Sequence, residues 1–168
     1  MSTLLDDAFG HHVWATLRLI DTCLDLDPDQ LETAVPGTYG SILETLRHTV
    51  AADAGYLSAI TGGEVGEVEE ATMDLAALRA VMEGHASAWA DVLARDLDPT
   101  AMIARLRDDG SQSLAPLGIR LAQALHHGSD HRSQVSTALT LLGIEPPAID
   151  VWDFAWVDGR LSEVPPPA

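Results

Sequence analysis

The chain has 168 residues, a length typical of one domain, and 46% of them are apolar. No apolar run approaches the roughly 20 residues that a membrane-spanning helix needs, so we predict no membrane segment. Nine Lys and Arg stand against 26 Asp and Glu, and the formal net charge of -17 would repel a nucleic acid backbone or an anionic lipid surface.

The first residues, MSTLLDDAFGHH, are acidic and contain no apolar stretch of the kind that a secretory signal requires, so we expect a cytoplasmic protein. The single cysteine, Cys23, cannot form an intramolecular disulfide and supplies no cysteine pair for a metal. We expect it to be a buried, inert thiol. Any metal site must therefore use His, Asp or Glu.

Apolar residues at helical spacing predict the first two helices. From residue 4 to about residue 26 they recur every three or four positions, and the acidic segment DLDPDQ then ends the helix at Pro28. A second helix is predicted over residues 41–61, because Ser41 and Glu44 have the spacing of a capping box and Gly62-Gly63 provides a stop.

A third helix is predicted over residues 74–94, where apolar positions and His85 alternate by threes and fours. The segment that follows has no helical stripe. Met102, Ala104 and Leu106 alternate before Asp109-Gly110, a turn signal, so we expect a loop or a short hairpin there.

The fourth helix is predicted over residues 117–142, ended by Gly143 and Pro146-Pro147. In the tail, residues 144–168, three aromatic residues are expected to pack back on the helices: Trp152, Phe154 and Trp156. These elements predict one all-α domain over residues 1–168, a four-helix bundle with a short irregular or hairpin excursion before the last helix. Exposed apolar faces of such bundles commonly pair, so we expect a homodimer.

The stretch HHGSDHRSQV, residues 126–135, brings several polar groups into the fourth helix. His127 and His131 are one turn apart on its inward side and could hold one divalent metal, which needs at least a third ligand. His48 is a candidate on the small-residue side of the second helix, although an ordinary surface histidine fits that position equally well. His12 and His85 are further candidates on spacing alone, but such residues are more often core histidines held by one hydrogen bond.

The arrangement of TLRH in the second helix, HxxxHRxQ in the fourth and LLGIEPPAID after it resembles the DinB/YfiT-like superfamily of small metal-binding four-helix bundles. The resemblance covers most of the chain, including the opening helix segment HHVWATLRLID. It implies an up-down-down-up bundle with a divalent metal such as zinc or nickel near one end. It also implies that His48, His127 and His131 are the ligands.

The same resemblance aligns Arg132 and Gln134 with the HRGQ signature of the family, with Ser133 in place of the usual glycine and Asp130 in place of a frequent histidine. We expect Gln134 to support a ligand by a hydrogen bond, and Arg132 to pair with an acidic residue or with a carboxylate of the ligand. Better understood relatives transfer low-molecular-weight thiols such as bacillithiol, mycothiol or glutathione to electrophiles, or use them in isomerisation.

The leading hypothesis is therefore a metal-dependent thiol S-transferase whose partners are a small thiol and an electrophile. A second hypothesis is metal-assisted hydrolysis, for which Asp53, five residues after His48, is the best candidate base; a buried hydrogen-bonding role for Asp53 is the alternative. A third is a non-catalytic metal-binding or ligand-binding stress protein, which a fourth protein ligand on the metal would favour.

Overall fold

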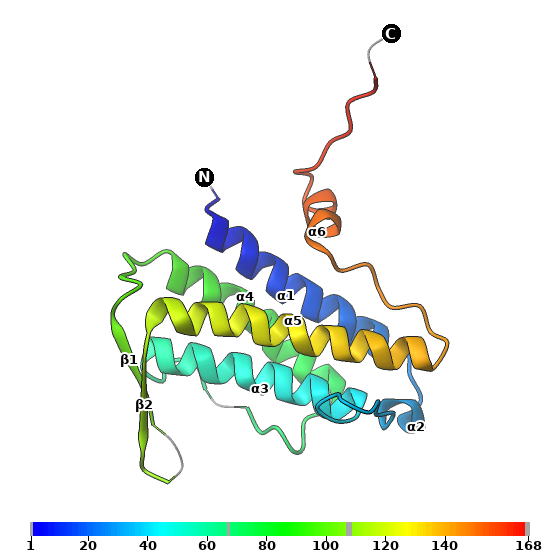
Figure 1. Cartoon of the computed structure of the whole chain (residues 1–168), viewed down its shortest axis with the longest axis horizontal. Helices are drawn as coiled ribbons and strands as arrows, with labels where there is room; N and C mark the ends of the chain where they lie inside the picture. Colours follow the sequence, from blue (N-terminus) through cyan, green and yellow to red (C-terminus); the bar gives the residue numbers. More distant parts are fainter. Residues whose placement is uncertain (1, 67, 107–108, 167–168) are drawn as a thin grey trace.

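The computed structural model describes residues 2–66, 68–106 and 109–166. Four long helices lie side by side: α1 (Leu4–Cys23), α3 (Ile42–Thr61), α4 (Leu75–Leu93) and α5 (Leu117–Leu141) (Figure 1). Helices α1 and α3 each pack against both α4 and α5. The apolar core lies among the four and includes Leu19, Leu46, Leu57, Met82 and Leu139, all at most 1% exposed. No helix in the described part of the chain is long and apolar enough to cross a membrane.

Capping side chains set the start of two long helices. Ser41 Oγ accepts the Glu44 N–H at 3.3 Å, and the Glu44 carboxylate accepts the Ser41 N–H at 2.8 Å, so α3 begins at Ile42. It ends before Gly62, whose φ of 71° lies in the left-handed region. Asp74 accepts the Ala77 N–H at 2.8 Å, and α4 therefore begins at Leu75.

Helix α1 ends at Cys23, three residues before the expected end at residue 26, and a short helix that the sequence analysis did not predict, α2 (Pro28–Leu31), follows. Pro28 occupies the first turn of α2, where its fixed φ fits and no N–H is needed. The Gln30 side chain accepts the Asp27 N–H at 2.9 Å. Pro28 thus begins a helix as well as preventing the extension of α1.

The segment before α5 forms an antiparallel hairpin of β1 (Met102–Leu106) and β2 (Gln112–Pro116), with Arg105 opposite Ser113. Residues 107 and 108 of the expected loop lie outside the described residues. The Arg120 guanidinium donates to the carbonyl oxygens of Ile103 and Ser113, both at 2.9 Å, which ties the hairpin to the start of α5. The molecule is therefore mostly helical with one small sheet, and the all-α description is too narrow.

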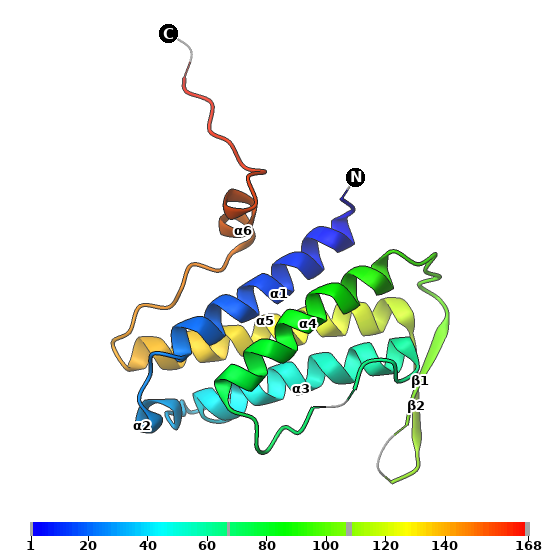
Figure 2. The same ribbon diagram turned by 180° about the vertical axis from the view of Figure 1, so that it is seen from behind.

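The C-terminal segment forms a further helix, α6 (Val151–Val157), against α1. The Phe154 ring lies 5.6 Å from the Trp14 ring and close to Gly10, whereas Trp152 and Trp156 are 70% and 57% exposed. Only one of the three aromatic residues expected to pack back, Phe154, thus contacts α1, and it is partly buried. Figures 1 and 2 show the chain after α6 extending away from the long helices.

Candidate metal centre

Three histidines meet between α3 and α5. His48 comes from α3, and His127 and His131 lie one turn apart on α5. Their ligand nitrogen atoms all lie within 4.8 Å of one another, with His127 Nε2 at 3.1 Å from His48 Nε2 and 3.2 Å from His131 Nε2. The packing of α3 against α5 therefore brings together residues that are 79 positions apart in the sequence.

Two of the rings are oriented by acceptors on their outer sides. His48 Nδ1 lies 3.1 Å from the Glu70 carboxylate, and His131 Nδ1 lies 3.1 Å from Gln134 Oε1. That amide oxygen also accepts the backbone N–H of Tyr39 at 2.9 Å. Because both oxygens can only accept, each Nδ1 carries the hydrogen. In neutral rings the Nε2 lone pairs of His48 and His131 then point inward.

The inward nitrogen atoms fit a bound divalent ion. His127 Nε2 can donate at most one hydrogen, but it faces the Nε2 lone pairs of both His48 and His131. In a neutral cluster without a metal, at least one of these lone pairs therefore lacks a hydrogen-bond donor. A tetrahedral ion at about 2.0–2.1 Å from each nitrogen would place the nitrogen atoms about 3.3–3.4 Å apart. This is close to the distances of 3.1 and 3.2 Å from His127 Nε2 to His48 Nε2 and His131 Nε2. The donor set suits a divalent transition metal.

The protonation of the cluster is also suited to binding a cation. Burial, followed by the neighbouring His131 and His48, lowers the pKa of His127 to about 4. Burial likewise lowers the pKa of His131, although the hydrogen bond with Gln134 opposes this shift. Both rings are thus neutral at pH 7, the form in which imidazole ligates a metal.

Two residues at the centre were missed by the sequence analysis. The Tyr39 ring stacks on His48, with centroids 4.0 Å apart and planes 13° apart, and its hydroxyl donates to Glu70 at 3.3 Å. An aromatic residue two positions before the capping residue Ser41 was a usable signal for Tyr39. Glu70 had no such signal, because it lies in an acidic loop without periodicity.

A cleft of about 310 Å³ opens beside the centre. His48 and His127 line it. The remaining lining residues come from α3, from the loop before α4 and from β1: Ala51, Ala52, Gly55, Tyr56, Val68, Glu70 and Arg105. Within the described residues, no fourth His, Cys, Asp or Glu joins the three histidines. A metal held there would keep coordination positions for a small molecule from the cleft.

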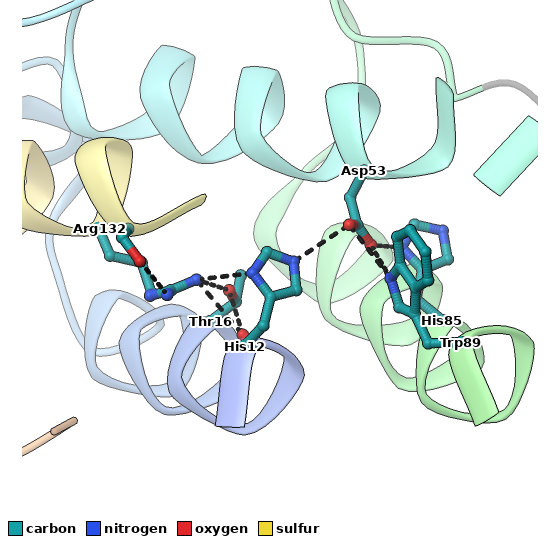
Figure 3. Close-up of polar contacts among 7 residues, drawn as sticks. His12, Thr16, Asp53, His85, Trp89 and Arg132 are labelled. Atoms are coloured by element: carbon teal, nitrogen blue, oxygen red, sulfur yellow. Dashed lines mark hydrogen bonds and ion pairs between the residues drawn. The ribbon is translucent and has the colours of Figure 1, made fainter. Parts of the chain in front are cut away.

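Asp53 belongs to a second, buried cluster, drawn in Figure 3. Its carboxylate is 2% exposed and accepts from His12 Nε2 at 3.1 Å, from His85 Nδ1 at 2.7 Å and from Trp89 Nε1 at 3.1 Å. Burial opposes ionisation, but the hydrogen bonds from His12 and His85 outweigh it and hold the pKa of Asp53 well below its usual range. Asp53 is therefore an ionised acceptor with three donors around it.

Arg132 joins this cluster from the α5 side (Figure 3). Its guanidinium donates to His12 Nδ1 at 3.1 Å, to Thr16 Oγ1 at 3.1 Å and to Ser129 Oγ at 3.2 Å. Burial lowers the pKa of Arg132 to about 10, against the opposing charge of Asp53, so Arg132 is still charged at pH 7. Because His12 Nδ1 accepts, His12 is neutral and carries its hydrogen on Nε2. A neutral ring thus separates the buried cation from the buried anion.

The residues singled out from the sequence therefore fall into two groups. His48, His127, His131 and Gln134 lie together at the candidate metal centre. The buried cluster contains Arg132, Asp53, His12 and His85, and His12 lies between Arg132 and Asp53, which form no direct ion pair. The roles of Asp53 as a base and of Gln134 as a support remain predictions. Cys23 is fully buried, and burial raises the pKa of its thiol to about 12.

The geometry defines a class of protein: a mostly helical domain that holds a three-histidine cluster between two of its helices. The DinB family model matches residues 1–163, and the chain belongs to the DinB family. It is similar to a crystal structure of a DinB-like protein from Bacillus cereus ATCC 10987, with a TM-score of 0.64, 17% identity, and coverage of 84% of this chain and 93% of that one. At this identity the likeness shows a shared fold. No curated protein matches the chain.

Proposed function

We propose that this DinB family protein is a divalent-metal-dependent enzyme that transfers a low-molecular-weight thiol to an electrophile. In this proposal His48, His127 and His131 hold the metal, zinc or nickel. The observation that carries it is the convergence of three ring nitrogen atoms beside an open cleft. A divalent ion lowers the pKa of a thiol or a water molecule that it coordinates, and so generates a nucleophile at neutral pH.

The chain itself would contribute orientation and access. Glu70 and Gln134 fix the tautomers of His48 and His131, and the stacked Tyr39 ring restricts the rotation of His48. Small side chains at Ala51, Ala52 and Gly55 leave room on α3 for two small molecules to approach each other.

Hydrolysis is less well supported than thiol transfer. Asp53, the candidate base, is buried and already accepts from His12, His85 and Trp89, so it has no free lone pair directed at the cleft. A purely structural metal is also less well supported, because the described residues supply three ligands and a structural site normally has four.

Two further features belong to the proposal. We take the four long helices as an up-down-down-up bundle, consistent with the packing of α1 and α3 against both α4 and α5. The homodimer stays a prediction, and sedimentation velocity would test it.

Metal content measured by elemental mass spectrometry on untagged protein is the first test. We expect about one equivalent of divalent metal in the wild type, none in His48→Ala and an unchanged amount in His126→Ala, which removes an exposed histidine of α5. The metal-loaded protein should then accelerate the reaction of glutathione, bacillithiol or mycothiol with an aryl halide. Hydrolysis of an ester without any thiol would favour the alternative. A wild type that takes up neither zinc nor nickel on dialysis would overturn the proposal.

A further inference from the structure

Arg105 brings a guanidinium group from the β1–β2 hairpin to the cleft beside the three histidines. It lines the same cleft as His48 and His127. A Cβ atom built on Gly55 would lie 3.5 Å from Arg105 Nη2 and 3.9 Å from its Cζ, which places the guanidinium directly against this glycine of α3. The guanidinium therefore lies at the α3 wall of the cleft, beside Gly55.

Its charge has no carboxylate partner in the described part of the chain, although the protein carries 26 acidic residues. Three other arginines of the described chain each form an ion pair with a carboxylate: Arg79, Arg95 and Arg160. Among residues 2–66, 68–106 and 109–166, no carboxylate oxygen lies within 4.0 Å of the Arg105 guanidinium. A cation without a carboxylate partner among the described residues is suited to an anionic ligand.

A second cation reinforces this end of the cleft. Arg120 is 7% exposed, and its guanidinium donates to the carbonyl oxygens of Ile103 and Ser113 rather than to a carboxylate. Burial, and after it the nearby charge of Arg105, lowers the pKa of Arg120. The two arginines are therefore close enough for their charges to repel, and Arg120 adds a second positive charge near Arg105 although it does not line the cleft itself.

The other walls restrict where a negative group can lie. Glu70 also lines the cleft, and its carboxylate accepts from His48 and Tyr39. It would repel a second anion near that wall, whereas Arg105 would attract one. A carboxylate matches the planar fork of a guanidinium with two parallel hydrogen bonds. The volume of about 310 Å³ suits a small organic molecule.

We propose that this cleft selects a small molecule that carries a carboxylate, bound by Arg105, and that places its other end at the three histidines. This inference rests on the proposed function, because it takes the ligand of the metal and the ligand of Arg105 to be the same molecule. Arg105 is a binding residue in it, with no part in bond making.

The test compares two thiols that differ only in charge, 3-mercaptopropionate and its amide, 3-mercaptopropionamide, titrated calorimetrically into the zinc-loaded protein. A hydrogen bond to a charged group predicts that the wild type binds the acid about tenfold more tightly than the amide. Arg105→Gln should bring the ratio to about one, with the affinity for the amide unchanged. Arg105→Lys should keep part of the preference, because it keeps the charge but loses the fork.

Arg95→Gln is the matched control, since it removes an exposed arginine that pairs with Glu64, and it should leave the ratio unchanged. Thermal melting of each variant separates a binding defect from a folding defect. Equal affinities for acid and amide in the wild type, or a preference that persists in Arg105→Gln, would overturn the inference.

A protein that takes up no zinc would overturn the proposed function without deciding the role of Arg105. In that case the amide signals of Gly55 and Arg105 are followed by NMR while propionate is added to the metal-free protein. Saturable shifts in the wild type that are absent in Arg105→Gln would support the anion site. No shift in the wild type would overturn it.

Discussion

Gly128 of α5 lies directly against His12 of α1. A Cβ atom built at Gly128 would lie 2.7 Å from His12 Nδ1 and 2.9 Å from Arg132 Nη1, closer than nonbonded atoms approach. The contact joins the helix that carries His127 and His131 to the buried cluster around Asp53. It therefore sets how closely α5 can approach α1.

Gly128→Ala should destabilise the protein, although replacing a helical glycine by alanine ordinarily stabilises a helix by about 0.5–1 kcal/mol. Overpacking against His12 predicts a loss of about 1–3 kcal/mol in the free energy of unfolding, measured by urea denaturation. Zinc affinity should fall as well, since a displaced α5 carries two of the three histidines. Gly84→Ala, at an exposed position of α4 with nothing within 4 Å, is the control and should be neutral or stabilising.

Asp53→Asn should lower the free energy of unfolding by about 3 kcal/mol, because it leaves Arg132 without a buried counter-charge and turns an amide N–H₂ toward ring donors. Urea denaturation of the metal-free protein measures this. If Asp53 were instead a catalytic base with little structural role, the variant would keep the wild-type stability and lose only activity. The two roles give opposite results in this one experiment.

Acid should destabilise the metal-free protein over a defined pH range. The pKa of His127 is about 4 in the folded state and about 6.5 when unfolded, so the unfolded chain binds the proton first. Stability should therefore fall as the pH drops from about 6.5 to about 4, and this group adds no further loss below that. Melting temperatures measured after chelation should show a shallower decline in His127→Gln. An identical decline in that variant would contradict the assignment.

Gln134→Leu should weaken metal binding about 10- to 100-fold, because His131 Nδ1 and the Tyr39 N–H lose their shared acceptor. Competition with a chromogenic zinc chelator gives the affinity. Gln123→Leu, at an exposed position of the same helix, serves as the control. Equal affinities in both variants would show that the oxygen of Gln134 does not support the ligand.

The long helices could be predicted because their end signals are local. Ser41 and Glu44 act on backbone groups three residues away, and Gly62 needs only its own φ. The short helices were missed for a related reason. Asp150 and Asp153 form a capping box for α6, but seven residues are too few to show a period.

The metal-ligating candidates could be named from a spacing and a family resemblance, but their surroundings could not. His12 and Arg132 are 120 residues apart, and Tyr39 and Gln134 are 95 apart. Such contacts depend on how α1, α3 and α5 pack, which no local pattern records. The position of Arg105 beside Gly55 depends on how β1 packs against α3, which sequence spacing does not show.

The hairpin that carries Arg105 adds little to the apolar core, since Met102, Leu106 and Leu114 are all more than half exposed. Substitutions in it cost little stability, whereas changes among the buried residues of α3 and α5 displace the histidines. Changes in the hairpin can therefore alter the wall of the cleft while the three-histidine cluster is kept. Divergence in specificity among descendants of this chain should concentrate in residues 102–116.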